Sequence, residues 1–453
     1  MDTIPNPARP EVEPAQRWVF PVPASQVLPN GLTVHTFDLP GQYVVSLRLI
    51  VPLSVRSEPR DKEGVATLMT RLLDEGTTRH STEEFTELLE RKGVAFGAGL
   101  SDGGLHVDAD VPASRLGDAL ELLVEAIAEP SFPPDQTRRL IKSRVAEIAQ
   151  ERASAPHRGA RELAATFFDA GDRASRPTAG SVETVENLTR EDVAAFHASQ
   201  VGPVGATLVV AGDLTGIDID SLIEQTFGTW SPMPHVVTPG AQPAHQAADA
   251  ARIVLVDRPD SVQSEIIVAG PGPDRRVSPA WAPYPVLGFV MGGSPSARID
   301  AVLREEKGYT YGMRASFRPR RAGGMFVTSG SVRTEVTAEA LDLVLGILEE
   351  ARTGFSDKEV REGIDFIVDT APGRFATADA VAEEAAAVIL DGLPLDFTTR
   401  NLDAMRALGP ADLDAAYARF VTGEWTIVVV GDASAYADQV RALGRGLVTV
   451  VPN

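Results

Sequence analysis

The 453-residue chain contains no cysteine. A disulfide framework, a thiolate zinc site and a cysteine nucleophile are therefore excluded. No apolar run approaches the roughly 20 residues that span a bilayer, so we expect no membrane segment. The N-terminal stretch MDTIPNPARPEVEPAQRWVFPVP lacks the basic and then apolar pattern of a secretory signal, and on that basis we expect a cytoplasmic protein.

Positive charge is also scarce. Lys and Arg total 42 against 63 Asp and Glu, which gives a formal net charge of −21. Because nucleic-acid-binding proteins usually concentrate Lys and Arg into a basic surface, we expect no nucleic-acid partner. The hydrophobic share of 43% and the charged share of 23% are typical of a globular protein, and the length suggests two or more domains.

Histidine is present but scattered. The seven histidines occupy positions 35, 80, 106, 157, 197, 235 and 245, and no two of them form a His-x-x-x-His pair. Their spacing predicts no metal site. The sequence also has no Gly-x-Ser-x-Gly elbow and no phosphate-binding P-loop, so the common hydrolase and nucleotide motifs do not apply.

The sequence does contain a long, weak internal repeat. The apolar, β-branched runs at 206–213 and 426–432 both end in Gly-Asp, which is typical of buried strands that stop at a turn. Gly212 and Gly431 are 219 positions apart, and the strand-turn-strand segments around Pro40 and Pro259 share this offset. Two separate landmarks with one offset indicate two similar halves.

Further pairs of segments support the repeat. Residues 90–97 (ERKGVAFG) resemble residues 305–312 (EEKGYTYG), and amphipathic helices are predicted at 116–128 and 338–350. We expect an α+β fold with two homologous domains, each a mostly antiparallel sheet covered by helices, facing each other across a cleft. The predicted division is an N-terminal arm at 1–24, a first domain at 25–231, a linker at 232–251 and a second domain at 252–453.

The second half carries GGSPSARI at 292–299, followed by LREEKGYTY at 303–311. This composite resembles the C-terminal signature of M16 (insulinase/pitrilysin-like) metallopeptidases, where a Gly/Ser-rich stretch enters a helix ending in Leu-Arg-Glu and a glycine turn leads into a strand bearing a tyrosine. The resemblance implies that Arg304 and Tyr311 are the pair that reaches the substrate beside the zinc. An arginine offers several fixed donors to substrate carbonyls, and a phenol can donate to the oxygen that becomes negative during attack.

Apart from the resemblance, both residues have ordinary interpretations. Arg304 fits a last-turn arginine that the helix dipole favours, and Tyr311 fits a half-buried strand tyrosine.

The first half departs from the family pattern. Active members carry His-x-x-Glu-His on a helix, and this chain keeps only the surrounding frame, GVATLMTRLLDEGT at 64–77. Thr67 and Arg71 stand in place of the two histidines, and Thr70 stands in place of the general-base glutamate. Threonine is a poor zinc ligand, and arginine keeps its positive charge. The zinc motif is therefore degenerate.

Glu147 lies near the position of the third zinc ligand of the family. One carboxylate without its histidines makes no zinc site, so we expect an ion-paired or solvated helix glutamate there and no metal or cofactor in this chain.

Some members of the family divide the two duties between chains. The resemblance therefore implies a heterodimer in which a partner with His-x-x-Glu-His holds the zinc and this chain supplies Arg304 and Tyr311 to hydrolyse peptides or unfolded polypeptides. The alternative is a catalytically inert structural, assembly or peptide-binding protein with the same shell. Self-association of the chain and an independent peptidase with other chemistry also stay open.

Overall fold

Residues 16–101, 103–231, 252–320 and 323–453 are described by this computed structural model. The predicted linker at 232–251 and most of the predicted arm lie outside these residues, and the domain limits stay a prediction. The first sheet has the strand order β1-β2-β6-β3-β5-β4, and the second has the order β12-β7-β11-β8-β10-β9. The strands of the first sheet are β1 (Ala24–Val27), β2 (Thr33–Asp38), β3 (Val44–Val51), β4 (Ala95–Ser101), β5 (Gly104–Pro112) and β6 (Thr207–Gly212). Those of the second are β7 (Arg252–Asp257), β8 (Gln263–Gly272), β9 (Arg314–Pro319), β10 (Gly324–Arg333), β11 (Thr426–Gly431) and β12 (Leu447–Pro452).

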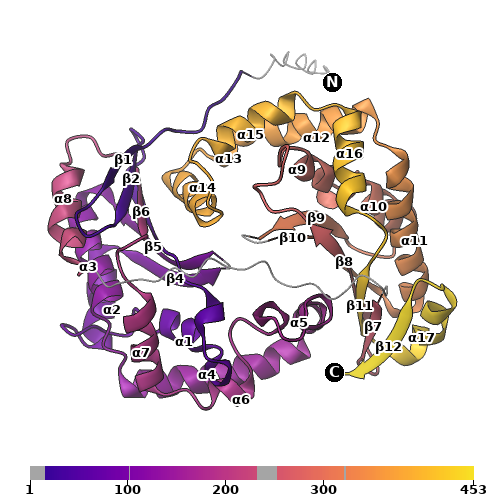
Figure 1. Cartoon of the computed structure of the whole chain (residues 1–453), viewed down its shortest axis with the longest axis horizontal. Coiled ribbons are helices and arrows are strands. Elements are labelled where there is room, and N and C mark those ends of the chain that lie inside the picture. Colours follow the sequence, from indigo (N-terminus) through magenta and orange to yellow (C-terminus); the bar gives the residue numbers. More distant parts are fainter. Residues whose placement is uncertain (1–15, 102, 232–251, 321–322) are drawn as a thin grey trace, which may run out of the picture.

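Helices surround both sheets (Figure 1). The first half contributes α1 (Val65–Arg71), α2 (Thr82–Lys92), α3 (Leu116–Ala128), α4 (Pro134–Ala153), α5 (Ala155–Phe167), α6 (Val182–Val185), α7 (Arg190–Gln200) and α8 (Ile219–Thr226). The second contributes α9 (Pro283–Gly288), α10 (Arg298–Asp300), α11 (Thr337–Glu350), α12 (Asp357–Asp369), α13 (Ala371–Arg374), α14 (Ala378–Leu390), α15 (Phe397–Arg406), α16 (Pro410–Phe420) and α17 (Ala433–Ala442). Within the described ranges, none of these helices combines the length and the apolar character that a bilayer crossing requires.

The two sheets repeat one topology. The series β2-β6-β3-β5-β4 of the first sheet recurs as β7-β11-β8-β10-β9 in the second, and both β2/β7 and β6/β11 are separated by 219 positions. Most neighbouring strands are antiparallel. Only the outer edge differs, because β1 runs antiparallel to β2 whereas β12 runs parallel to β7. The predicted α+β fold with two homologous halves is confirmed.

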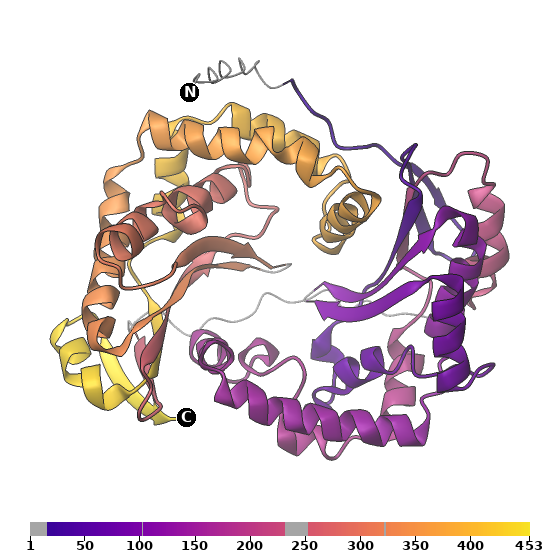
Figure 2. The same cartoon turned by 180° about the vertical axis from the view of Figure 1, so that it is seen from behind.

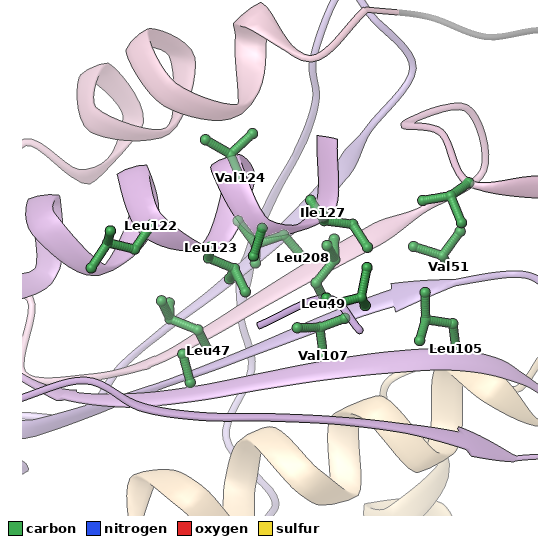
Figure 3. Close-up of a cluster of buried hydrophobic side chains, with 14 of the residues drawn as sticks. Leu47, Leu49, Val51, Leu105, Val107, Leu122, Leu123, Val124, Ile127 and Leu208 are labelled. Atoms are coloured by element: carbon green, nitrogen blue, oxygen red, sulfur yellow. The ribbon is translucent and has the colours of Figure 1, made fainter. Parts of the chain in front are cut away.

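Alternating apolar residues bury both faces of each sheet. In β3, Leu47, Leu49 and Val51 belong to the core beneath the helices of the first half, whereas Ile50 belongs to a separate cluster on the opposite face. Successive side chains of a strand point to opposite faces, which explains this division. Figure 3 shows leucines and valines of β3 and β5 directed toward Leu123 and Ile127 of α3.

The opposite faces are covered by an exchange of helices between the halves. Helix α14 of the second half packs its alanine-rich face on Phe37, Ile50 and Val209 of the first sheet. In return, α5 of the first half packs Leu163 on the second sheet. Both views show the two helices lying between the halves (Figures 1 and 2). The halves therefore face each other, and each completes the core of the other.

A buried arginine ties α14 to the first sheet. The side chain of Arg48 in β3 is 6% exposed and forms ion pairs with Asp379 and Glu383 of α14. It also lies 3.5 Å from Asp108 and 3.4 Å from Asp110, both on β5. Burial raises the pKa of Asp108, and the charge of Arg48 opposes this shift. The cation thus holds together carboxylates that would otherwise repel one another across the contact between the halves.

We expect Arg48→Met to lower the free energy of unfolding by about 1–2 kcal/mol. Removing one partner of a fully buried ion pair costs more, but the carboxylates of Asp379 and Glu383 are largely solvated, which reduces the loss. Urea unfolding followed by circular dichroism measures the change. Arg60→Met, at an exposed arginine, is the control and should stay within about 0.5 kcal/mol of the unmodified chain. Equal stability of both variants would contradict this role of Arg48.

Candidate functional site

A buried glutamate fixes the helix that bears the degenerate zinc motif. Helix α1 begins after Gly64, whose φ of 102° is a conformation that glycine adopts readily. The Glu58 Oε1 accepts hydrogen bonds from the backbone N–H groups of Gly64 and Ala66, each at 3.0 Å. Its Oε2 accepts one from Arg173 at 2.8 Å. Burial raises the pKa of Glu58 against these bonds. The glutamate therefore acts as the cap that α1 otherwise lacks.

The three positions of the degenerate motif differ in their surroundings. Thr67 is half-buried on α1. Thr70 is buried, and its hydroxyl donates to the Ala66 carbonyl at 2.8 Å, one turn back in the same helix. Arg71 points to α4, where its Nη1 lies 2.8 Å from both carboxylate oxygens of Glu147. Arg71, in place of the second histidine of the motif, is thus ion-paired with Glu147, near the position of the third zinc ligand.

The Arg71–Glu147 pair belongs to a longer chain of charges along α4. Arg144 donates to Glu147 at 3.2 Å and to Glu151 at 3.0 Å. Partial burial raises the pKa of Glu147, but hydrogen bonds from Arg71 and Arg144 outweigh it and hold the pKa below its usual range. The glutamate is therefore ionised and neutralised by guanidinium groups.

These residues do not fit a zinc ion. The Arg71 guanidinium forms an ion pair with the Glu147 carboxylate, which a zinc ion would need as a ligand, and a fixed positive charge repels a cation. Across the described ranges, no group of three or more His, Cys, Asp and Glu side chains is placed to hold a metal. No catalytic step through zinc is derived for this chain.

The second-half signature folds into an unusual helix. Arg304 lies in a π-helical segment, Ala301–Glu306, and a second π-helical segment, Phe289–Gly293, lies nearby. Such segments are rare and often mark functional sites. Gly292 permits close packing here, because an added Cβ would lie 2.3 Å from the backbone N of Ala315 in β9. The predicted helix ending in Leu-Arg-Glu is therefore present, with a wider turn.

A buried aspartate holds the loop that follows this helix. The side chain of Asp300 is fully buried, and its Oδ1 accepts from the backbone N–H of Met313 at 2.7 Å. Its Oδ2 accepts from Arg314 at 3.1 Å. The Thr310 hydroxyl donates to the Ser331 carbonyl of β10 at 2.8 Å. Both ends of the loop at 308–313 are therefore fixed to the protein core.

Tyr311 projects from this fixed loop into solvent. Its exposed fraction is 95%, and it lies in a bend three residues before β9 begins. The interpretation of Tyr311 as a half-buried strand tyrosine is therefore wrong, because the Thr310 and Asp300 hydrogen bonds shape a loop where a strand was expected. Among the described residues, its phenol has no hydrogen-bond partner.

Arg304 is also accessible. Its side chain is 39% exposed and forms an ion pair with its own neighbour Glu305, with Nε and Oε1 3.5 Å apart. In the described part of the chain, no hydrogen bond or ion pair joins Arg304 or Tyr311 to Arg71 or Glu147. The structure thus brings Arg71 and Glu147 together and leaves the second-half pair open.

Arg298 anchors the start of the same helical region. Its guanidinium donates to both carboxylate oxygens of Glu359 on α12, at 2.7 and 3.0 Å, and lies 4.6 Å from the ring centroid of Phe355. Arg298, together with a smaller contribution from Ser356, lowers the pKa of Glu359 to about 2. This pair fixes the segment that carries Arg304 to the helical frame.

The Glu359 pair predicts a pH-dependent stability. A carboxyl group whose pKa is depressed from 4.5 to about 2 on folding stabilises the protein fully above pH 4.5, and the contribution is lost as the pH falls toward 2. We expect Glu359→Gln to lower the free energy of unfolding at pH 7 by about 1–2 kcal/mol. The deficit relative to the unmodified chain should shrink between pH 4.5 and pH 3. Urea titrations at each pH measure this difference in the free energy of unfolding, and Glu362→Gln on the exposed face of α12 is the control.

Sequence comparisons find one family in both halves of the chain. A sequence model described as Insulinase (Peptidase family M16) matches residues 33–180, and one described as Peptidase M16 inactive domain matches residues 187–365. An uncharacterized zinc protease of Mycobacterium tuberculosis is 24% identical over 353 residues, 77% of this chain and 80% of the relative. The non-peptidase homolog YmxG of Helicobacter pylori is 20% identical over 359 residues, 78% of this chain and 81% of the relative.

Solved structures share the fold. A peptidase M16 inactive domain from Pseudomonas fluorescens superposes with a TM-score of 0.83 at 22% identity, covering 90% of this chain and 97% of that one. A protease from Helicobacter pylori superposes with a TM-score of 0.81 at 17% identity, covering 91% of this chain and 100% of that one. With both sequence models placed in order along the repeat, the chain belongs to the M16 peptidase family.

Proposed function

We propose that this chain is the non-zinc subunit of a two-chain M16 peptidase and supplies Arg304 and Tyr311 to a zinc site on its partner. The observation that carries the proposal is the fixed but open geometry of these two residues. The loop of Tyr311 is anchored through the buried Asp300, and its phenol is nevertheless 95% exposed. A rigid loop that presents an unpartnered donor is the arrangement that pre-organised stabilisation of a developing oxyanion requires.

The first half supports a division of duties. An ion pair between Arg71 and Glu147 fills the position where a metal and its ligand would meet. The frame around it is retained, since Glu58 still caps α1. A chain with an intact second-half pair and a neutralised first-half site fits a subunit that completes the zinc site of another chain.

Strand β4 supports a polypeptide as the substrate. Its sequence is AFGAGLS, and within the described residues it stands at the edge of the first sheet with β5 as its one strand neighbour. An extended segment can pair with such an edge through backbone hydrogen bonds, and small side chains leave room for the added strand. We therefore propose peptides or unfolded polypeptides as substrates.

Mixing the chain with a zinc-bearing M16 subunit tests the proposal. We expect this chain alone to leave a quenched fluorescent peptide intact and the mixture to cleave it much faster than the partner alone. The gain should saturate at one chain of each kind, because the proposed site needs one contribution from each. A mixture that is no faster than the partner alone would reject the proposal.

A second candidate is a catalytically inert structural or peptide-binding protein. The similarity to a relative that is named a non-peptidase homolog favours it. It predicts that peptides bind to the chain and that no partner turns binding into cleavage. The mixing experiment therefore separates the two candidates.

A further inference from the structure

Six arginines line a cavity between the two halves. It has a volume of about 380 Å³ and lies between α4 and α5 of the first half and the β9–β10 hairpin of the second. The arginines that line it are Arg152, Arg158, Arg161, Arg176, Arg318 and Arg320. This concentration is unusual in a chain whose formal net charge is −21.

Three of these arginines form no ion pair with a carboxylate of the described residues. Arg158 pairs with Glu162 at 2.7 Å, and Arg176 pairs with Glu63 at 2.8 Å. By contrast, no ion pair within the described residues involves Arg152, Arg161 or Arg318.

Nearby carboxylates do not neutralise the cavity. Glu183 is fully exposed; a hydrogen bond with Ser181 lowers its pKa most, and Arg161 and Arg152 lower it further. The acidic residue in the lining is Glu151, and Arg144 already holds both of its carboxylate oxygens. An excess of positive charge therefore faces the cavity, and a bound anion would compensate it.

The floor of the cavity is apolar. Leu163 and Phe168 are buried there, and Met325 of β10 lies beside them. The guanidinium of Arg320 lies 5.1 Å from the ring centroid of Phe168. The cavity thus combines an apolar base with a cationic wall, which suits a carboxylate attached to an aliphatic or aromatic group.

We propose that this cavity binds an acidic segment of a polypeptide and gives the chain a preference for substrates with Asp or Glu. The inference rests on the proposed function, because a chamber that admits polypeptides brings such a segment to the cavity. The position of the cavity supports a polypeptide segment as its ligand, because Ile148 and Glu151 line the cavity and follow Glu147 on α4. A segment that passes the degenerate motif would therefore meet the arginines within about one helical turn.

Peptide binding to the full chain tests the inference. The probe is a short labelled peptide with several Glu residues, and its comparison is the same peptide with Gln in place of each Glu. At low salt we expect the Glu peptide to bind at least about tenfold more tightly, and the difference to decrease as salt is added. Fluorescence anisotropy gives both dissociation constants.

Variants at exposed arginines locate the effect. Arg161→Ala combined with Arg318→Ala should remove most of the preference for the Glu peptide and leave binding of the Gln peptide unchanged. Arg361→Ala, at an exposed arginine on α12, is the matched control and should keep the preference. Melting temperatures of all variants show that each one is folded.

The outcomes separate this inference from the proposed function. Equal binding of both peptides, or an undiminished preference in the double variant, would overturn the acidic-segment inference and leave the proposed function intact. Binding of neither peptide would also overturn the inference, and the mixing experiment would then decide the proposed function separately. Displacement of the Glu peptide by free glutamate at the same carboxylate concentration would also overturn the inference, because the cavity would then be a site for small anions.

Discussion

Replacing Tyr311 by phenylalanine is expected to lower kcat/KM of the mixed two-chain peptidase by about 10²–10³, the usual effect of losing one donor to a developing oxyanion. The change removes a single hydroxyl from a side chain that is 95% exposed, so the fold and the assembly with the partner should be unaffected. Because the donor acts mainly in the transition state, the loss should appear in kcat more than in KM.

Two exposed residues provide matched controls for this pair. Tyr43→Phe makes the same change at a tyrosine that is 74% exposed in the first half, and it should leave the rate unchanged. Arg304→Ala should also lower kcat/KM, whereas Arg361→Ala should not. If Tyr311→Phe and Tyr43→Phe behave alike, the phenol of Tyr311 has no role in catalysis.

Restoring the metal ligands is expected to have an equally large effect on zinc binding. The variant with Thr67→His, Thr70→Glu and Arg71→His removes the guanidinium from Glu147 and places two imidazoles one turn apart on α1. Glu147 already lies within hydrogen-bond distance of the residue 71 side chain, so a three-ligand site should form. We expect one zinc ion per chain to survive gel filtration, where the unmodified chain retains none.

Single changes distinguish a built site from loose metal adsorption. The Arg71→His variant alone should not retain zinc, because its site would consist of one imidazole and the Glu147 carboxylate. Adding Glu147→Gln to the restored variant should abolish zinc retention. Retention that persists without Glu147 would show that α4 does not supply the third ligand.

The repeat in the sequence was sufficient to predict the fold. Buried strands such as β6 and β11 consist of uninterrupted β-branched residues that stop at Gly-Asp, and their common offset revealed the two halves. The helix at 116–128 was also predictable, because its apolar positions recur with helical spacing. The strand and helix patterns are local, so a short window of sequence contains each of them, and comparing such windows along the chain shows the repeat.

The exchange of α5 and α14 could not be predicted in this way. Each helix presents apolar residues to the half that does not contain it, and a periodic pattern does not state which sheet it will cover. The same holds for Arg48, whose partners on α14 are more than 300 positions away. Contacts of this kind depend on how the halves meet.

For the candidate site, the sequence predicted Arg304 and Tyr311, but it did not indicate Asp300, which holds the Tyr311 loop, or Glu58, which caps α1. Glu58 and Asp300 are buried carboxylates that satisfy backbone N–H groups, and neither belongs to a motif. Asp300 did leave a signal, since it stands three positions before the buried Leu303 on the same helical face. The ion pair of Arg71 with Glu147 joins residues 76 positions apart, so it required the structure.

The zinc content and peptidase activity of the purified chain by itself test the central claim most directly. Because Arg71 neutralises Glu147 and no other ligand set is present in the described residues, the account predicts no bound zinc and no hydrolysis, with activity only after the zinc-bearing partner is added. One zinc per chain together with unaided, chelator-sensitive cleavage would contradict it, and would place a complete active site elsewhere in this chain.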